Sequence, residues 1–248
     1  MKSIKYAAVL VAATAMMSVT GVPSALAAEA PNFKLKAGET FPVNFTSTSG
    51  ATTLITTKGR EVHCETDTNE GEITATTSIK KLVVKFHKCT AKGPFGTLTC
   101  TTASESGTIV TDDLNGLPVY TSAAEAATAV GVSLTPESGA VFASFTCTGT
   151  LVSETLTVGV SSEPTNGKDS LVCGITPINT FSTKSTLACK QKGGVQEPSE
   201  YWLGGTAHID YLETKGEGSE PFPFEQSGQE TSGGDEITTA KEVELKAA

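Results

Sequence analysis

Cysteine placement constrains this chain more than any other feature of its sequence. Three of the six cysteines, Cys64, Cys89 and Cys100, lie in one short stretch. The pattern Cys-x-Thr-x4-Gly-x-Ile begins at Cys64 and again at Cys100, and residues 81–89 between the copies have the clearest strand pattern of the chain. The stretch predicts two related strand-turn-strand units pinned by cysteines, with the first turn at residues 67–71.

The first 27 residues have the pattern of a signal peptide for export. Lys2 and Lys5 precede an apolar run at residues 7–19 that is short for a bilayer span, and residues 25–27 form a small-x-small cleavage site. We therefore expect a mature chain of residues 28–248 that is secreted or extracytoplasmic, with no membrane insertion after signal cleavage.

Disulfides persist in that compartment, and six cysteines allow every thiol to be paired. Six cysteines also allow 15 connectivities, which the sequence alone does not resolve. Neighbourhood in the sequence favours two links of hairpin scale and leaves one long-range link. The proposed pairs are Cys89–Cys100, Cys173–Cys189 and Cys64–Cys147.

A metal site is the competing interpretation of these cysteines, because His63 adjoins Cys64 and His87 lies two residues before Cys89. Closely spaced Cys-x2-Cys pairs are absent from the sequence, so disulfides are favoured and neither a metal nor a cofactor is expected. Residues 67–72 are weakly similar to a calcium loop, but the glycine comes one position early, which favours a solvated turn.

Short segments rich in threonine and valine follow one another between Gly, Pro, Asn and Asp turns, as in β proteins. We expect an all-β chain with a single-domain β-sandwich or β-barrel-like body of many short, mostly antiparallel strands, stapled by disulfides. A loose leader at about residues 28–39 precedes it. Residues 122–129 are the one helix candidate. In the strand at residues 81–89, alternation points Leu82, Val84 and Phe86 into the core.

Charge excludes some partners. Removing the two signal lysines from the 18 basic residues leaves 16 against 27 acidic residues, a net charge of −11. Nucleic acids and anionic membranes attract basic patches, so no nucleic-acid partner is expected. An unknown protein or glycan remains as the expected partner.

Candidate sites are few. Tyr201, Trp202 and Tyr211 are a possible ligand face, because sugar-binding surfaces use exposed aromatic rings, although a sole tryptophan is more often packed against the core. The pair Asp112 and Asp113 is more often a turn than a catalytic dyad, and no Gly-x-Ser-x-Gly elbow occurs in the sequence. No catalytic residue is assigned.

A series of short motifs runs along most of the mature chain in a distinctive order. They are Cys64, residues 71–73, residues 83–89, Cys100, residues 107–111, residues 114–116, residues 145–147, residues 176–179 and residues 224–228. This order resembles an uncharacterised group of exported, cysteine-containing all-β bacterial proteins with no assigned activity, so the resemblance implies no catalytic or binding residue. Cys173 and Cys189 are additional to the group's pattern, which supports pairing them with each other.

The sequence thus favours a secreted or cell-envelope-associated, non-enzymatic structural or interaction protein of unknown partner. The alternative is a carbohydrate-binding module that uses the region of Tyr201 and Trp202. A secreted hydrolase is the least favoured class, and it would require His208, Asp210 and a serine within hydrogen-bond reach in a cleft.

Overall fold

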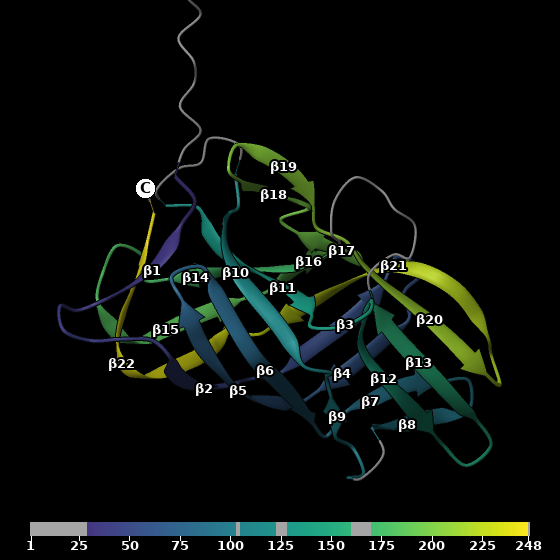
Figure 1. Ribbon diagram of the computed structural model, residues 1–248. Helices are drawn as coiled ribbons and strands as arrows, with labels where there is room; N and C mark the ends of the chain where they lie inside the picture. Colours follow the sequence, from purple (N-terminus) through teal and green to yellow (C-terminus); the bar gives the residue numbers. More distant parts are fainter. Residues whose placement is uncertain (1–28, 103–104, 123–127, 160–169, 248) are drawn as a thin grey trace, which may run out of the picture.

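The computed structural model describes residues 29–102, 105–122, 128–159 and 170–247 (Figure 1). Within these ranges the chain is all-β, its strand pairings are antiparallel, and no helix occurs. The all-β, antiparallel expectation is therefore confirmed. The expected signal peptide at residues 1–27 and most of the expected helix at residues 122–129 lie outside the described residues.

Eight strands form a closed circuit of hydrogen-bonded neighbours, here called the first ring. The pairing of β6 with β10, which sets Leu114 opposite Leu82, completes the circuit. Shorter strands extend it at the sides: β1 (Asn32–Leu35) on β22, β9 (Ile109–Val110) on β6, and the hairpin of β18 (Glu200–Leu203) and β19 (Thr206–Ile209) on β10. In order around the ring the strands are β10 (Leu114–Tyr120), β11 (Val130–Pro136), β14 (Leu171–Thr176), β15 (Ser182–Ala188), β22 (Asp235–Lys246), β2 (Val43–Ser49), β5 (Thr66–Ala75) and β6 (Ser78–His87).

A second closed barrel of eight strands, the second ring, lies beside the first (Figure 1). Closure leaves neither ring with a free edge in its circuit, which protects backbone groups from pairing with other chains. A separate hairpin of β16 (Lys190–Lys192) and β17 (Val195–Glu197) pairs only with itself among the described strands. The second ring runs β12 (Val141–Thr148), β13 (Ser153–Gly159), β20 (Leu212–Gly218), β21 (Phe222–Thr231), β3 (Thr52–Thr56), β4 (Glu61–Cys64), β7 (Thr90–Gly93) and β8 (Gly96–Thr101).

The two rings share one hydrophobic core. Phe45 and Val132 of the first ring and Phe145 and Leu156 of the second ring belong to the same cluster of buried side chains. The expected single sandwich or single barrel is therefore wrong in its architecture, because the described residues form two closed rings around one core. Local alternation predicts strands but not which distant strands close a circuit.

The leader is also more ordered than expected. Residues 32–35 form β1, whose register along β22 runs from Asn32 opposite Lys246 to Leu35 opposite Val243. Phe33 is buried in the shared core, with 3% of its surface exposed. A loose leader over residues 28–39 is therefore wrong for β1, because an apolar side chain is available to anchor it.

The strand of residues 66–75 differs from the repeat hypothesis. The turn expected at residues 67–71 is wrong, since β5 continues straight through it and pairs with both β2 and β6. Gly71 is required there by a close approach, because a Cβ would lie 2.6 Å from the Phe45 ring. On β6 the expected phase is confirmed, as Leu82 is buried and Val84 and Phe86 pack against the core.

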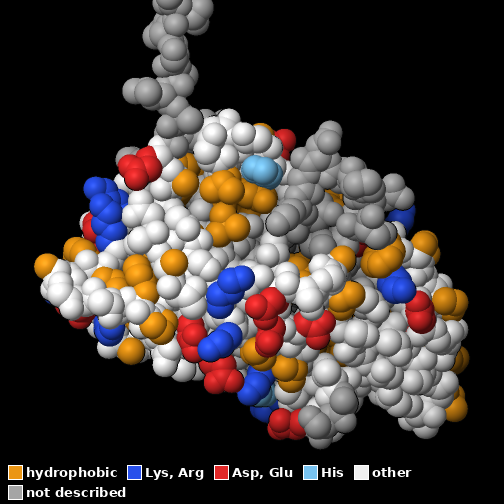
Figure 2. Space-filling view, viewed as in Figure 1, with side chains coloured by type: hydrophobic (Ala, Val, Ile, Leu, Met, Phe, Trp, Pro, Cys, Tyr) orange, Lys and Arg blue, Asp and Glu red, His pale blue; other side chains and the backbone are white. Residues whose placement is uncertain are grey.

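The outer face of β5 and β6 is a ladder of cross-strand ion pairs. Two lysines of β6 pair with glutamates of β5: Lys81 with Glu72 at 3.1 Å and Lys85 with Glu70 at 3.6 Å. Lys88, directly after β6, pairs with Glu65, directly before β5, at 2.6 Å. Figure 2 shows basic and acidic side chains side by side across the middle of this face. Exposed pairs contribute little energy each, so this surface is a solvated face rather than a binding patch.

All six cysteines are paired, but only one expected pair is confirmed, Cys173–Cys189. The expected pairs Cys64–Cys147 and Cys89–Cys100 are wrong, because the structure joins Cys64 to Cys89 and Cys100 to Cys147. Strand register explains both. Extending the pairing of Thr66 with His87 two residues outward brings Cys64 opposite Cys89, and Cys100 on β8 lies directly opposite Cys147 on β12.

This connectivity predicts the products of a non-reducing digest. Peptide mapping of the oxidised protein should recover Cys64 with Cys89, Cys100 with Cys147 and Cys173 with Cys189. Replacing Cys100 and Cys147 together by alanine should lower the free energy of unfolding by about 2–4 kcal/mol, because the unfolded chain loses a cross-link. A peptide that joins Cys64 to Cys147 would contradict the register.

Candidate ligand-binding cavity

A mostly apolar cavity of about 160 Å³ lies in the core that the two rings share. Phe45 and Leu134 line it from the first ring, and Phe145 and Val158 line it from the second ring. Apolar cavities of about 150 Å³ in other proteins stay dry and bind molecules such as benzene or xenon. The volume of this cavity therefore suits a small apolar molecule.

The cavity reaches the surface beside β15. Its lining includes Lys184 and Pro177, both of which are exposed, as well as the half-buried Ser182 and Ser185. A lining that runs from fully buried to exposed residues gives the interior a route to solvent. Lys184 is the single basic side chain among the lining residues that the structure describes.

Three of the polar side chains that interrupt the apolar wall, Asp67, Asn69 and Asp235, lie together and are here called the polar corner. Asp67 is 2% exposed, and its Oδ2 accepts hydrogen bonds from the hydroxyl groups of Ser49 and Thr52, the latter at 3.0 Å. A buried carboxylate needs such donors, because burial without a partner costs several kcal/mol, on the order of 2–7 for a neutral polar group and more for a charge. The two hydroxyls hold this carboxylate in place.

Asn69 connects the two acids. Its Nδ2 donates to Ser47 Oγ at 2.6 Å and to Asp235 Oδ1 at 3.4 Å. Asp235 is 5% exposed, and its pKa is raised from 3.8 to about 8 by burial, by the nearby charge of Asp67 and by a hydrogen bond with Asp67. Asp235 therefore keeps its proton at neutral pH, because two carboxyl groups this close do not both ionise cheaply in a buried site.

The polar corner forms where the chain passes between the rings. The β2–β3, β4–β5 and β21–β22 connections all cross from one ring to the other, and they bring Ser49, Thr52, Asp67 and Asp235 to one place. On β5 the residues at odd positions face inward, from Asp67 through Asn69 to Ile73, while Thr68 and Glu70 face solvent. Strand alternation thus carries an acid and an amide into the core.

Sequence reasoning missed this site. The composition of residues 67–71 matches a turn, and a turn would have placed Asp67 in solvent. The available signal was the alternation of Glu70 and Glu72 with the uncharged Asn69, Gly71 and Ile73, which fits a half-buried strand. Asp235 was missed because it is the first residue of β22, directly after the glycine pair Gly233 and Gly234.

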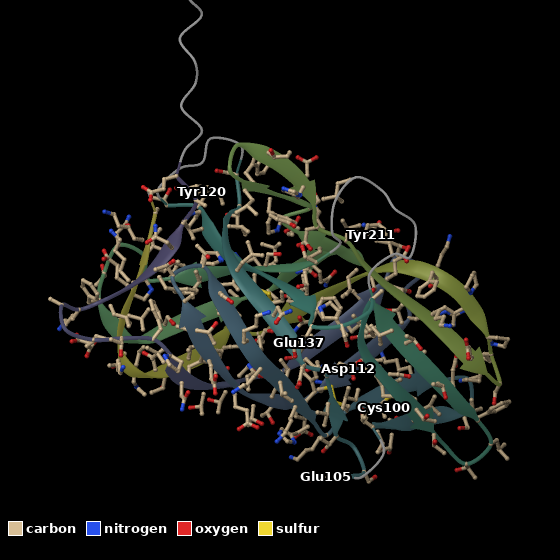
Figure 3. All side chains as sticks on the ribbon, in the orientation of Figure 1. Cys100, Glu105, Asp112, Tyr120, Glu137 and Tyr211 are labelled. Carbon is tan, nitrogen blue, oxygen red and sulfur yellow. A yellow bond between two sulfur atoms is a disulfide. The ribbon has the colours of Figure 1, made fainter. Side chains whose placement is uncertain are left out.

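The aromatic residues expected to form a ligand face are only partly available for one. Tyr201 is buried, with 4% of its surface exposed, and it stacks on His208 with ring centroids 5.0 Å apart. Trp202 is half-buried and packs against the core. Tyr211 is half-buried just before β20, and Figure 3 shows it away from Tyr120 on β10. The prediction is wrong for Tyr201, because β18 turns this ring inward.

The residues proposed for hydrolysis have structural partners. Asp210 is buried, and its Oδ2 accepts the backbone N–H of Val172 at 3.0 Å. Asp112 and Asp113 are exposed in the connection before β10, where the carbonyl of Asp113 accepts the N–H of Glu137 at 2.7 Å (Figure 3). The Asp210 carboxyl group and the Asp113 backbone therefore hold strands and loops in place.

A second, more polar cavity of about 410 Å³ lies within the second ring. Arg60 lies over the Phe222 ring at 4.1 Å and 3.7 Å from Glu225, so its charge is already compensated. Burial raises the pKa of Glu154 in the same cavity, while Arg60 lowers it. Three basic and three acidic side chains line this cavity, and this balance favours no single ligand charge.

Within the described ranges, no group of three or more His, Cys, Asp and Glu side chains is placed to hold a metal ion. The same residues contain no helix long and apolar enough to span a membrane. Comparisons with protein-family models, with characterised proteins and with solved structures found no match.

The acid pair predicts how stability depends on pH. The pKa of Asp235 is higher in the folded protein than in the unfolded chain, so its contribution to stability is complete at low pH and is lost as pH rises toward about 8. This contribution to the melting temperature of the native protein should therefore fall from about pH 4 to about pH 8. Asp235→Asn carries a permanent donor in place of the proton and should show a flatter profile. Parallel profiles for the two proteins would contradict this assignment.

Proposed function

We propose that this chain is an exported, non-enzymatic binding protein that holds a small apolar molecule in the cavity between its two rings. The observation that carries the proposal is the cavity itself, which has an apolar wall, a size suited to a ligand and a route to the surface beside β15. Protein interiors are normally packed to the density of organic crystals, so a cavity of this size lowers the stability of the fold. A binding role would explain why the cavity is kept.

The cysteines support the export part of the proposal. All six form disulfides, and such bonds persist in oxidising compartments outside the cytosol. Two of the bonds brace the strands that carry the cavity: Cys64–Cys89 joins the β5–β6 hairpin at its open end, and Cys100–Cys147 joins β8 to β12. A wall that keeps its shape without a ligand lowers the entropy cost of binding.

Binding of an apolar molecule fits these residues better than binding of a carbohydrate. Sugar-binding faces use exposed aromatic rings, and the buried Tyr201 removes one of the three rings that the sequence offered. The cavity wall, in contrast, is made of aliphatic and aromatic side chains such as Leu82, Phe142 and Val158. Such a wall favours apolar ligands over sugars.

Filling the cavity should abolish binding. Ala143 is buried on β12 and lines the cavity, so Ala143→Leu places three more carbon atoms in it. Toluene at 100 times its Kd should stabilise the native protein by about 2.7 kcal/mol and raise its melting temperature. The same toluene concentration should leave the melting temperature of Ala143→Leu unchanged.

A matched control separates cavity filling from a general effect of leucine. Ala207 is exposed on β19 and does not line the cavity, so Ala207→Leu should keep the toluene response. Isothermal titration of toluene into the three proteins measures the affinities directly. Absence of toluene binding to the native protein would refute the proposed function.

A further inference from the structure

The polar corner offers the cavity hydrogen-bond acceptors that receive no donor. Two of the buried side-chain oxygens that line the cavity, Asp67 Oδ1 and Asn69 Oδ1, receive no hydrogen bond from any described hydroxyl, amide or ammonium group. Three nearby donor groups are directed to other oxygens: Ser49 and Thr52 donate to Asp67 Oδ2, and Asn69 Nδ2 donates to Ser47 and Asp235. A ligand group that donates hydrogen bonds at this corner would therefore satisfy two buried oxygens that lack a donor.

The corner also favours a positive charge. Asp67 and Asp235 come from different strands, β5 and β22, and lie within hydrogen-bonding distance of each other in a site that water does not reach freely. Two buried carboxyl groups repel each other when both are ionised, and a cation between them removes this repulsion. Without a ligand, the proton on Asp235 removes this repulsion at neutral pH.

Resting on the proposed function, we propose that the cavity's ligand is a small amphipathic amine, whose apolar body fills the cavity and whose ammonium group lies at Asp67 and Asp235. The ammonium donates to the Asp67 and Asn69 oxygens that lack donors. It takes the place of the proton on Asp235, and that proton is released to solvent when the cation binds.

Neighbouring strands add one opposing charge. β22 is flanked by β2 and β15, and the titratable groups that line the cavity from all elements are Asp67, Asp235 and Lys184. Ser47 and Ser49 of β2 are neutral. Lys184 is exposed on β15, where solvent screens its charge, so it opposes amine entry at the mouth more than amine binding at the corner.

A matched ligand series tests the proposal. Toluene, benzyl alcohol, benzylamine and benzoate share one ring and differ in the group that the ring carries. At about pH 7 benzylamine should bind the native protein at least about tenfold more tightly than toluene, benzyl alcohol should be intermediate, and benzoate should bind most weakly. Titration calorimetry in two buffers of different ionisation enthalpy should show release of about one proton for benzylamine and none for toluene.

The variant Asp235→Asn removes one carboxyl group while keeping its shape. The ratio of benzylamine to toluene affinity should fall about tenfold in this variant, and proton release should disappear. Toluene binding by the same variant reports whether its cavity is intact. If the variant does not fold, the proton count on the native protein decides, because a structural acid pair that is not displaced releases nothing.

The outcomes separate the two proposals. The amine inference is overturned if the protein binds toluene but does not prefer benzylamine. It is also overturned if benzylamine binds without releasing a proton. In both cases the apolar cavity remains the binding site. Binding of none of the four ligands overturns the proposed function and the inference together. A rise of benzylamine affinity from about pH 6 to about pH 8, as the competing proton is lost, supports displacement at the acid pair.

Discussion

The core shared by the two rings is the constraint on which the rest of the structure depends. Neither ring encloses its apolar side chains alone, because Phe45 and Val132 of the first ring pack in the same cluster as Phe145 and Leu156 of the second. The chain passes between the rings several times, so the rings are built from interleaved parts of the sequence. Burial of apolar surface, at roughly 25 cal/mol per Å², therefore stabilises the assembled pair of rings rather than either ring alone.

The disulfides follow from this interleaving. Cys64–Cys89 links the end of β4 in the second ring to the end of the β5–β6 hairpin in the first, and so it fixes one of the crossings. Cys100–Cys147 closes the second ring between β8 and β12, across 47 residues of sequence. Longer loops lose more entropy when they are closed, so these links restrict the unfolded chain where the native contacts are least local.

Local patterns were sufficient for the strands and insufficient for their partners. Alternation placed Leu82 in the core, and the glycine pair Gly204 and Gly205 lies where β18 turns into β19. Closure of the first ring depends on β6 meeting β10, a pairing that no local signal marks. The two wrong disulfide pairs have the same origin, because cysteine partners depend on register between strands and proximity in sequence is a poor guide to it.

The candidate site was hidden for a related reason. Asp, Asn and Gly are the residues of turns, and residues 67–71 contain all three, so composition predicted a turn where the structure has a continuous strand. Tertiary pairing on both sides of β5 overrides that preference, since β2 and β6 satisfy its backbone groups. The turn-like residues then point inward, where Asp67 meets hydroxyl donors and Gly71 gives room to Phe45.

The connections that cross between the two rings do not themselves require the two buried acids, Asp67 and Asp235. Hydroxyl and amide groups such as Ser47, Thr52 and Asn69 would satisfy the strand ends without burying a charge, and replacing buried charges by neutral groups is often stabilising. Asp235 instead destabilises the folded protein progressively as pH rises toward about 8. An acid pair that carries a removable proton, faces a cavity and lacks donors for two of its neighbouring oxygens is explained more fully by a cation that enters the cavity than by the packing of the strands.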